Sequence, residues 1–228
     1  MRKVIKAVAT LMLTFAVVCS ACTKDPENGG SNNGNGSGSA NGHGYVDLGL
    51  ASGILWATCN VGASTPEGYG DYFAWGETQL KEVYNWDSYK YYNGTSFTKY
   101  NESDGFIVLQ PMDDAATANW GSGWRIPTKV EWEELINNTT VTWMTKNGIN
   151  GWKFTASNGN SLFLPAAGGR LDGELDGTGA GFNGHYWSSS LASYNAQYAW
   201  YFTFIWEDYW LKNDTRYPGF SVRPVREN

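Results

Sequence analysis

The C-terminal segment, residues 185–225, constrains the fold most, because large apolar residues alternate there with chemically mixed ones. It contains the motifs HYWSSS, AWYFTF and GFSVRPV, separated by stretches rich in Tyr, Asn, Asp and Lys. Since successive side chains on a strand point to opposite faces, Trp200, Phe202 and Phe204 share one face, whereas Tyr201 and Thr203 share the other. We predict a strand with one core face and one face available to a ligand.

Elsewhere the patterns predict short strands, one well-specified helix and long loops. Thr128 followed by Glu131 is a capping box at the start of a helix through Ile136, with Trp132 on its apolar face. A shorter helix is predicted over 113–120, and the Tyr-rich segment 77–101 predicts a long loop held by its aromatic rings. Strands are predicted at 45–50, 54–57, 141–144, 151–155 and 161–164. Few helices and many short strands predict an α+β domain.

The N-terminal part predicts export. Residues 1–21 begin with basic residues and continue with an apolar run, as targeting segments do. That run is shorter than the roughly 20 apolar residues that a membrane-spanning helix needs. Small residues precede Cys22 as in the cleavage box of a bacterial lipoprotein, so we predict lipidation of Cys22; a plain secretory signal is the alternative. Residues 22–44, mostly Gly, Asn and Ser after the first few, predict a flexible tether.

Composition limits the function classes. Removal of residues 1–21 leaves 13 of the 16 basic residues against 22 acidic ones. This acidic balance argues against nucleic acid as a partner, because nucleic-acid binding needs basic patches. With Cys19 removed and Cys22 lipidated, Cys59 is the last cysteine of the mature chain, so we expect no internal disulfide.

Six sequence motifs between Tyr45 and Arg226 resemble, in this order, those of a known family. They are YVDLGL with ILWATCNVG, YGDYFAWGE, GWRIPTKVEWEEL, SLFLPAAGGR, YWSSS and GFSVRPV. They resemble the Fibrobacter succinogenes major paralogous domain of exported proteins of the Bacteroidota. The resemblance implies a C-type lectin-like fold of the formylglycine-generating-enzyme type for residues 45–228, with short antiparallel strands, one or two helices and long loops.

The C-terminus also resembles the variable proteins of diversity-generating retroelements, in which fixed scaffold residues alternate with rewritten ones. The resemblance implies a variable-type region at about 185–225 and a scaffold that includes Tyr186, Trp187, Trp200, Arg216 and Gly219. An alternative is that aromatic residues such as Trp206, Tyr209, Trp210 and Tyr217 are purely structural. The predicted ligand-binding residues are Ser193, Tyr194, Asn195, Gln197, Tyr201, Thr203, Trp206, Asp208, Trp210, Lys212, Asp214 and Tyr217.

No catalytic, metal or cofactor site is predicted. The segment that starts at Asp172 begins like a calcium loop, but its twelfth position is Asn183 in place of a bidentate Glu. Enzymes of the formylglycine-generating type use a cysteine pair near the C-terminus, and no cysteine follows Cys59. Glycoside hydrolysis needs two facing carboxylates, and the spacing of the acidic residues selects no pair.

The sequence therefore favours a lipoprotein of the outer membrane, facing the cell exterior, that binds an extracellular protein or glycan as an adhesin or receptor. Aromatic and short polar residues in loops form contact surfaces of this kind in paratopes. Two alternatives remain open: a structural or fimbrial-tip component of a surface assembly, and an unrecognised hydrolase.

Overall fold

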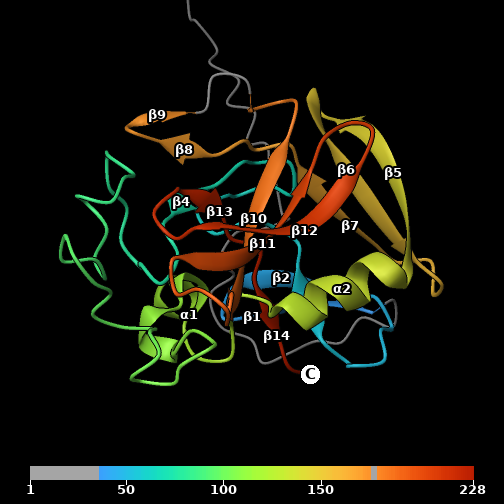
Figure 1. The fold of residues 1–228 in the computed structure, drawn as a ribbon. Coiled ribbons are helices and arrows are strands. Elements are labelled where there is room, and N and C mark those ends of the chain that lie inside the picture. Colours follow the sequence, from blue (N-terminus) through green and yellow to red (C-terminus); the bar gives the residue numbers. More distant parts are fainter. Residues whose placement is uncertain (1–35, 176–178) are drawn as a thin grey trace, which may run out of the picture.

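The computed structural model describes residues 36–175 and 179–228. Within these ranges the chain forms small, mostly antiparallel sheets and two α-helices, an α+β or mostly β structure (Figure 1). The predicted signal segment, the lipidation site at Cys22 and the first part of the predicted tether lie outside the described residues.

The first sheet has the order β1-β2-β3-β14 and joins both ends of the described chain. The strands predicted at 45–50 and 54–57 are present in shorter form and pair with each other, with Tyr45 of β2 opposite Ala57 of β3. The prediction of an unstructured tether is wrong for residues 37–44, which form the β1–β2 hairpin. The hairpin is ordered by a contact with a residue distant in sequence: the His43 ring stacks on Trp120 at 3.8 Å and fixes the hairpin to the rest of the domain. The strands are β1 (Ser37–Ala40), β2 (His43–Asp47), β3 (Leu55–Ala57) and β14 (Val225–Arg226).

The capping-box prediction is confirmed at the start of α2 (Lys129–Asn137). The Thr128 side chain accepts from the Glu131 backbone N–H, and the Glu131 carboxylate accepts from the Thr128 N–H at 2.7 Å. Arg125 holds the same carboxylate through two bonds. Burial alone would raise the pKa of Glu131, but the hydrogen bonds from Arg125 and Thr128 and the Arg125 charge together lower it. Trp132 is fully buried and stacks on Phe202 at 5.0 Å, so α2 is fixed against the C-terminal strands.

The predicted strands after α2 form a sheet in the order β5-β6-β7. Their bounds are β5 (Thr139–Lys146), β6 (Ile149–Ala156) and β7 (Ser161–Pro165). A short hairpin of β8 (Arg170–Leu171) and β9 (Glu174–Leu175) follows.

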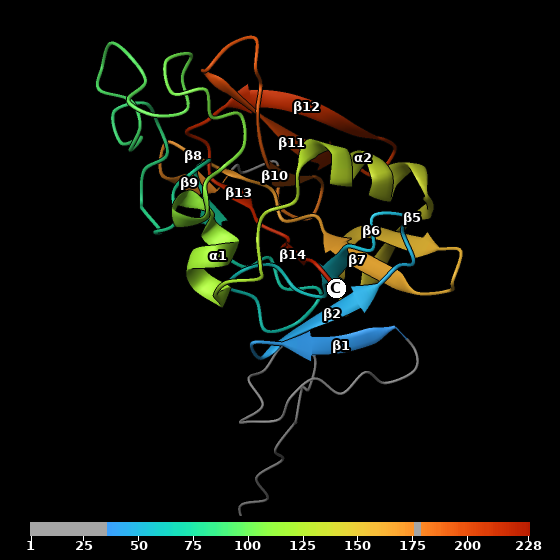
Figure 2. The same cartoon turned by 90° about the horizontal axis from the view of Figure 1, so that it is seen from below.

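The largest sheet has the order β12-β11-β10-β13-β4, which places β12 at its edge. In Figure 2 the edge strand β12 and the β1–β2 hairpin lie on opposite sides of the molecule, with α2 beside β11 and β12. The strands are β4 (Tyr72–Phe73), β10 (Gly184–Leu191), β11 (Tyr198–Phe204), β12 (Tyr209–Thr215) and β13 (Phe220–Ser221).

A buried arginine ties the last segment to the first sheet. Arg223 is fully buried, and its guanidinium donates to the Asn60 side chain at 2.9 Å and to the carbonyl of Thr58 at 2.9 Å. Burial lowers the pKa of Arg223 to about 10, so the side chain stays charged at neutral pH. The arginine of GFSVRPV therefore has a structural role.

The Tyr-rich segment 77–101 packs on the body through buried rings, as predicted. Asp113, at the end of the 3-10 helix η1 (Pro111–Asp113) and just before α1 (Ala115–Trp120), anchors these rings. Its buried carboxylate accepts from Tyr91, from Tyr100 at 2.7 Å and from Lys99 at 2.5 Å. Burial alone would raise the pKa of Asp113, but these bonds outweigh it and lower the pKa to about 2.

Cys59 is buried and disulfide-bonded. The expectation of no internal disulfide applies to a chain that lacks Cys19 and carries a lipid on Cys22; both of these cysteines lie outside the described residues, so the expectation stays a prediction. Among the helices of residues 36–175 and 179–228, none is both long and apolar enough to cross a membrane.

Candidate functional site

The predicted binding residues lie on and around the β11–β12 hairpin. The two strands pair in register from Tyr198 opposite Thr215 to Phe204 opposite Tyr209. Residues directly opposite each other share a face, so Trp210, Lys212 and Asp214 lie on the same face as Tyr201 and Thr203. The register therefore places all five predicted residues of these two strands on one face of the hairpin.

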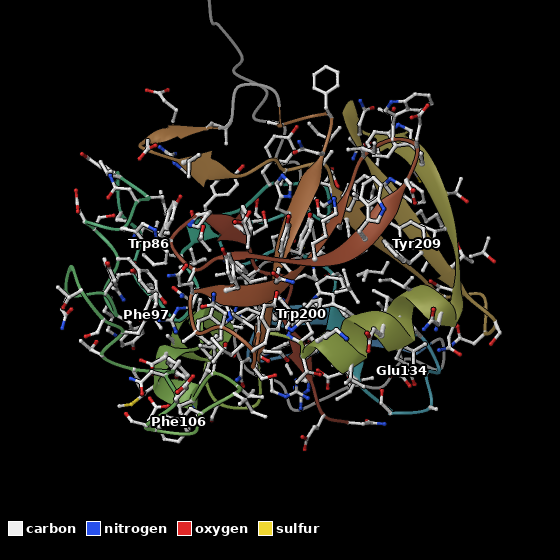
Figure 3. All side chains as sticks on the ribbon, viewed as in Figure 1. Trp86, Phe97, Phe106, Glu134, Trp200 and Tyr209 are labelled. Carbon is white, nitrogen blue, oxygen red and sulfur yellow. The ribbon has the colours of Figure 1, made fainter. Side chains whose placement is uncertain are left out.

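The first face of β11 is core, as predicted for two of its three aromatic residues. Phe202 and Phe204 are fully buried. Trp200 is only half-buried, and the ammonium group of Lys129, at the start of α2, lies 4.6 Å from its ring centroid. In Figure 3, Trp200 and Tyr209 mark the two ends of the hairpin beside α2.

The prediction that the second face of β11 is available is wrong. Tyr201 is 8 % exposed and Thr203 is 5 % exposed, because side chains of the neighbouring strands β10 and β13 in the same sheet pack on them. The Tyr201 ring lies 5.0 Å from Phe220 and 6.0 Å from Trp187, and Thr203 Oγ1 lies 2.8 Å from His185 Nδ1. Burial, with a smaller contribution from the Asp214 charge, raises the pKa of Tyr201 to about 12.

The hairpin turn is the most exposed part of the predicted set. Trp206 is 60 % exposed, and Glu207 and Asp208 beside it are exposed as well. The turn is nevertheless fixed, because the Ile205 backbone N–H donates to the Asp208 carbonyl at 2.9 Å and Trp152 Nε1 donates to the Ile205 carbonyl at 2.7 Å. A rigid turn thus presents a large aromatic side chain next to two acidic ones.

The loop between β10 and β11 forms a second exposed group at the other end of the hairpin. Ser193, Tyr194, Asn195 and Gln197 are all exposed, and Tyr194 is 67 % exposed. The Tyr194 hydroxyl donates to the Asn213 side chain at 2.6 Å, which connects this loop to β12. The structure therefore places the exposed predicted residues in two separate groups.

The remaining predicted residues are less available. Trp210 and Asp214 are half-buried, and exposed Lys212 lies with its ammonium group 4.4 Å from the Trp210 ring centroid. Tyr217 packs on Trp86 with ring centroids 4.7 Å apart, so the structural alternative holds for this residue. The Tyr209 ring also packs on an aromatic neighbour, Trp152, at 5.3 Å.

Arg216, directly after β12, is a buried arginine that contacts the aromatic loop 77–101. Its side chain is fully buried, 4.1 Å from the Phe97 ring centroid, and it donates to the Tyr100 carbonyl at 3.1 Å. Burial lowers the pKa of Arg216, but neighbouring aromatic and carbonyl groups surround its charge. This scaffold residue fixes the end of β12 to the aromatic loop 77–101, whose Trp86 and Phe97 are labelled in Figure 3.

Helix α2 contributes surface residues that the sequence did not single out. Lys129 contacts both Trp200 and Glu133, the latter at 2.6 Å. Glu133, Ile136 and Asn137 line a pocket together with Tyr209, Trp210 and Leu211. The capping box located the helix, but no local signal indicated that it lies along β12.

In the described ranges no three His, Cys, Asp or Glu side chains gather as a metal site would require. The residue Asp176 of the calcium-like segment lies outside those ranges. The prediction that the chain is not an enzyme therefore stays a prediction.

After comparison with known proteins, the family resemblance stays an expectation that rests on the six sequence motifs. No family model matches the chain, and no curated protein or solved structure matches it significantly.

Proposed function

We propose that this chain is a surface-exposed lipoprotein whose C-type lectin-like domain binds an extracellular ligand, in an adhesin or receptor role. One observation carries the proposal: the exposed residues around Tyr194 and Trp206 are mixed aromatic and polar, while most of the strand between them is buried. Fixed support beneath adaptable contact residues is the arrangement of a paratope, where rigid aromatic rings supply area at low entropic cost.

The position of the hairpin supports a role at the cell surface. The described chain begins beside β1, and β12 lies on the opposite side of the molecule (Figure 2). A lipid at Cys22 would therefore anchor the protein from the side that faces away from the hairpin. Diversification of residues 185–225 is part of the same proposal, and it requires a near-copy of these codons, altered at adenines, beside a reverse transcriptase gene.

The binding proposal is tested with the mature lipoprotein, screened on arrays of extracellular proteins and of glycans. We expect the Tyr194→Ala/Trp206→Ala variant to bind its hits at least tenfold more weakly while its thermal unfolding is unchanged. Met112→Ala is the matched control, because Met112 is 74 % exposed and lies outside the predicted region. Hits that the double variant keeps at full affinity would refute the assignment of these loops.

A further inference from the structure

A pocket of about 330 Å³ lies between one face of α2 and strand β12. It adjoins the exposed turn that carries Trp206, since β12 begins at Tyr209. Specific small-ligand sites span roughly 300–1,000 Å³, so this pocket has room for one small ring at most. Its lining residues are Glu133, Ile136, Asn137, Tyr209, Trp210 and Leu211.

Several polar side-chain atoms of the residues that line this pocket have no hydrogen-bond partner within the described part of the chain. Glu133 uses one carboxylate oxygen to accept from Lys129, and its other oxygen has no partner within the described part of the chain. The same holds there for the Asn137 side-chain amide and the Tyr209 hydroxyl, which have no hydrogen-bond partner. The three residues that carry these groups, Glu133, Asn137 and Tyr209, all line the pocket.

The apolar part of the lining is rigid. The Tyr209 ring is held by Trp152, and it also lies 6.2 Å from the Phe202 ring. Leu211 and Ile136 are half-buried and pack against the same core cluster. Because these side chains are already ordered, binding a ligand against them costs little additional conformational entropy.

We propose that this pocket binds one neutral sugar ring of an extracellular glycan, which names the ligand class for the binding function proposed above and rests on it. A sugar ring presents apolar C–H groups on its faces and hydroxyl groups at its rim. Those two sets match the aromatic and aliphatic walls and the carboxylate and amide of the pocket. A neutral sugar is favoured over an acidic one, because Lys129 already pairs with Glu133 and the nearby turn carries Glu207 and Asp208.

The pocket is tested with the mature protein on an array of neutral hexose, deoxyhexose and N-acetylhexosamine oligosaccharides, followed by calorimetric titration of each hit. We expect Glu133→Gln and Asn137→Ala each to weaken binding about tenfold without lowering thermal stability. Tyr209→Phe should weaken it less, since this variant keeps the ring. Glu102→Gln is the charge-matched control at an exposed position outside the pocket.

Each outcome separates the two proposals. A glycan that binds wild-type protein but loses affinity only in Tyr194→Ala or Trp206→Ala supports the loops and overturns the pocket. A protein ligand in place of any neutral glycan also overturns the pocket and leaves the binding function standing. If no variant of either group changes the affinity of a bound ligand, both proposals are wrong.

Discussion

Replacement of Tyr201 and of Trp206 by alanine should have opposite consequences, although the sequence predicted both as ligand contacts. Tyr201 is 8 % exposed and packs on Phe220 and Trp187, whereas Trp206 is 60 % exposed at the hairpin turn. Removal of a buried large aromatic side chain costs about 3–5 kcal/mol. Trp206→Ala should change the free energy of unfolding by no more than about 0.5 kcal/mol, as surface substitutions do.

The assay is urea unfolding followed by circular dichroism, with a parallel thermal melt. For a domain of this size each kcal/mol shifts the melting temperature by about 2–4 °C, so Tyr201→Ala should lower it by roughly 6–20 °C. Tyr201→Phe is the matched control: among the described residues its hydroxyl has no hydrogen-bond partner, so the loss should stay below about 1 kcal/mol. Equal losses for Tyr201→Ala and Trp206→Ala would refute the division of the hairpin into buried strand and exposed turn.

Three further outcomes are expected. Thr128→Ala removes the acceptor of the α2 capping box and should cost about 1 kcal/mol in urea unfolding; no loss would show that the cap is dispensable. Gly184→Ala should lower the melting temperature, because an added Cβ would lie 2.4 Å from the Phe204 ring, and unchanged melting would contradict that packing. The folded-state pKa of Asp113 lies below its unfolded value, so its stabilisation is complete above about pH 4 and is lost as the pH falls towards about 2. Asp113→Asn should flatten the acid side of the stability profile over that interval, and an unchanged profile would show that other carboxylates control it.

The sequence predicted those elements whose specification is local. The capping box located α2 because Thr128 and Glu131 satisfy each other within one turn. The alternation at 199–204 located β11 and correctly assigned Phe202 and Phe204 to the core. Long-range pairing was not predictable in the same way: Phe220 covers Tyr201 only because β13 lies beside β10, and His43 orders β1 only through Trp120.

The same long-range pairing limits what the candidate site can recognise. Strand β11 spans residues 198–204, so its ends lie about 20 Å apart at roughly 3.3 Å per residue. The exposed group around Tyr194 lies at one end, and the turn with Trp206 and the α2 pocket lies at the other. One sugar ring cannot contact both. A ligand that engages both groups must span about the length of β11, whereas a small ligand would use one end and leave the other free for a separate contact. Because most of the strand between them is buried, exposed residues at either end can change without disturbing the core, and substitutions at the two ends should contribute independently to binding.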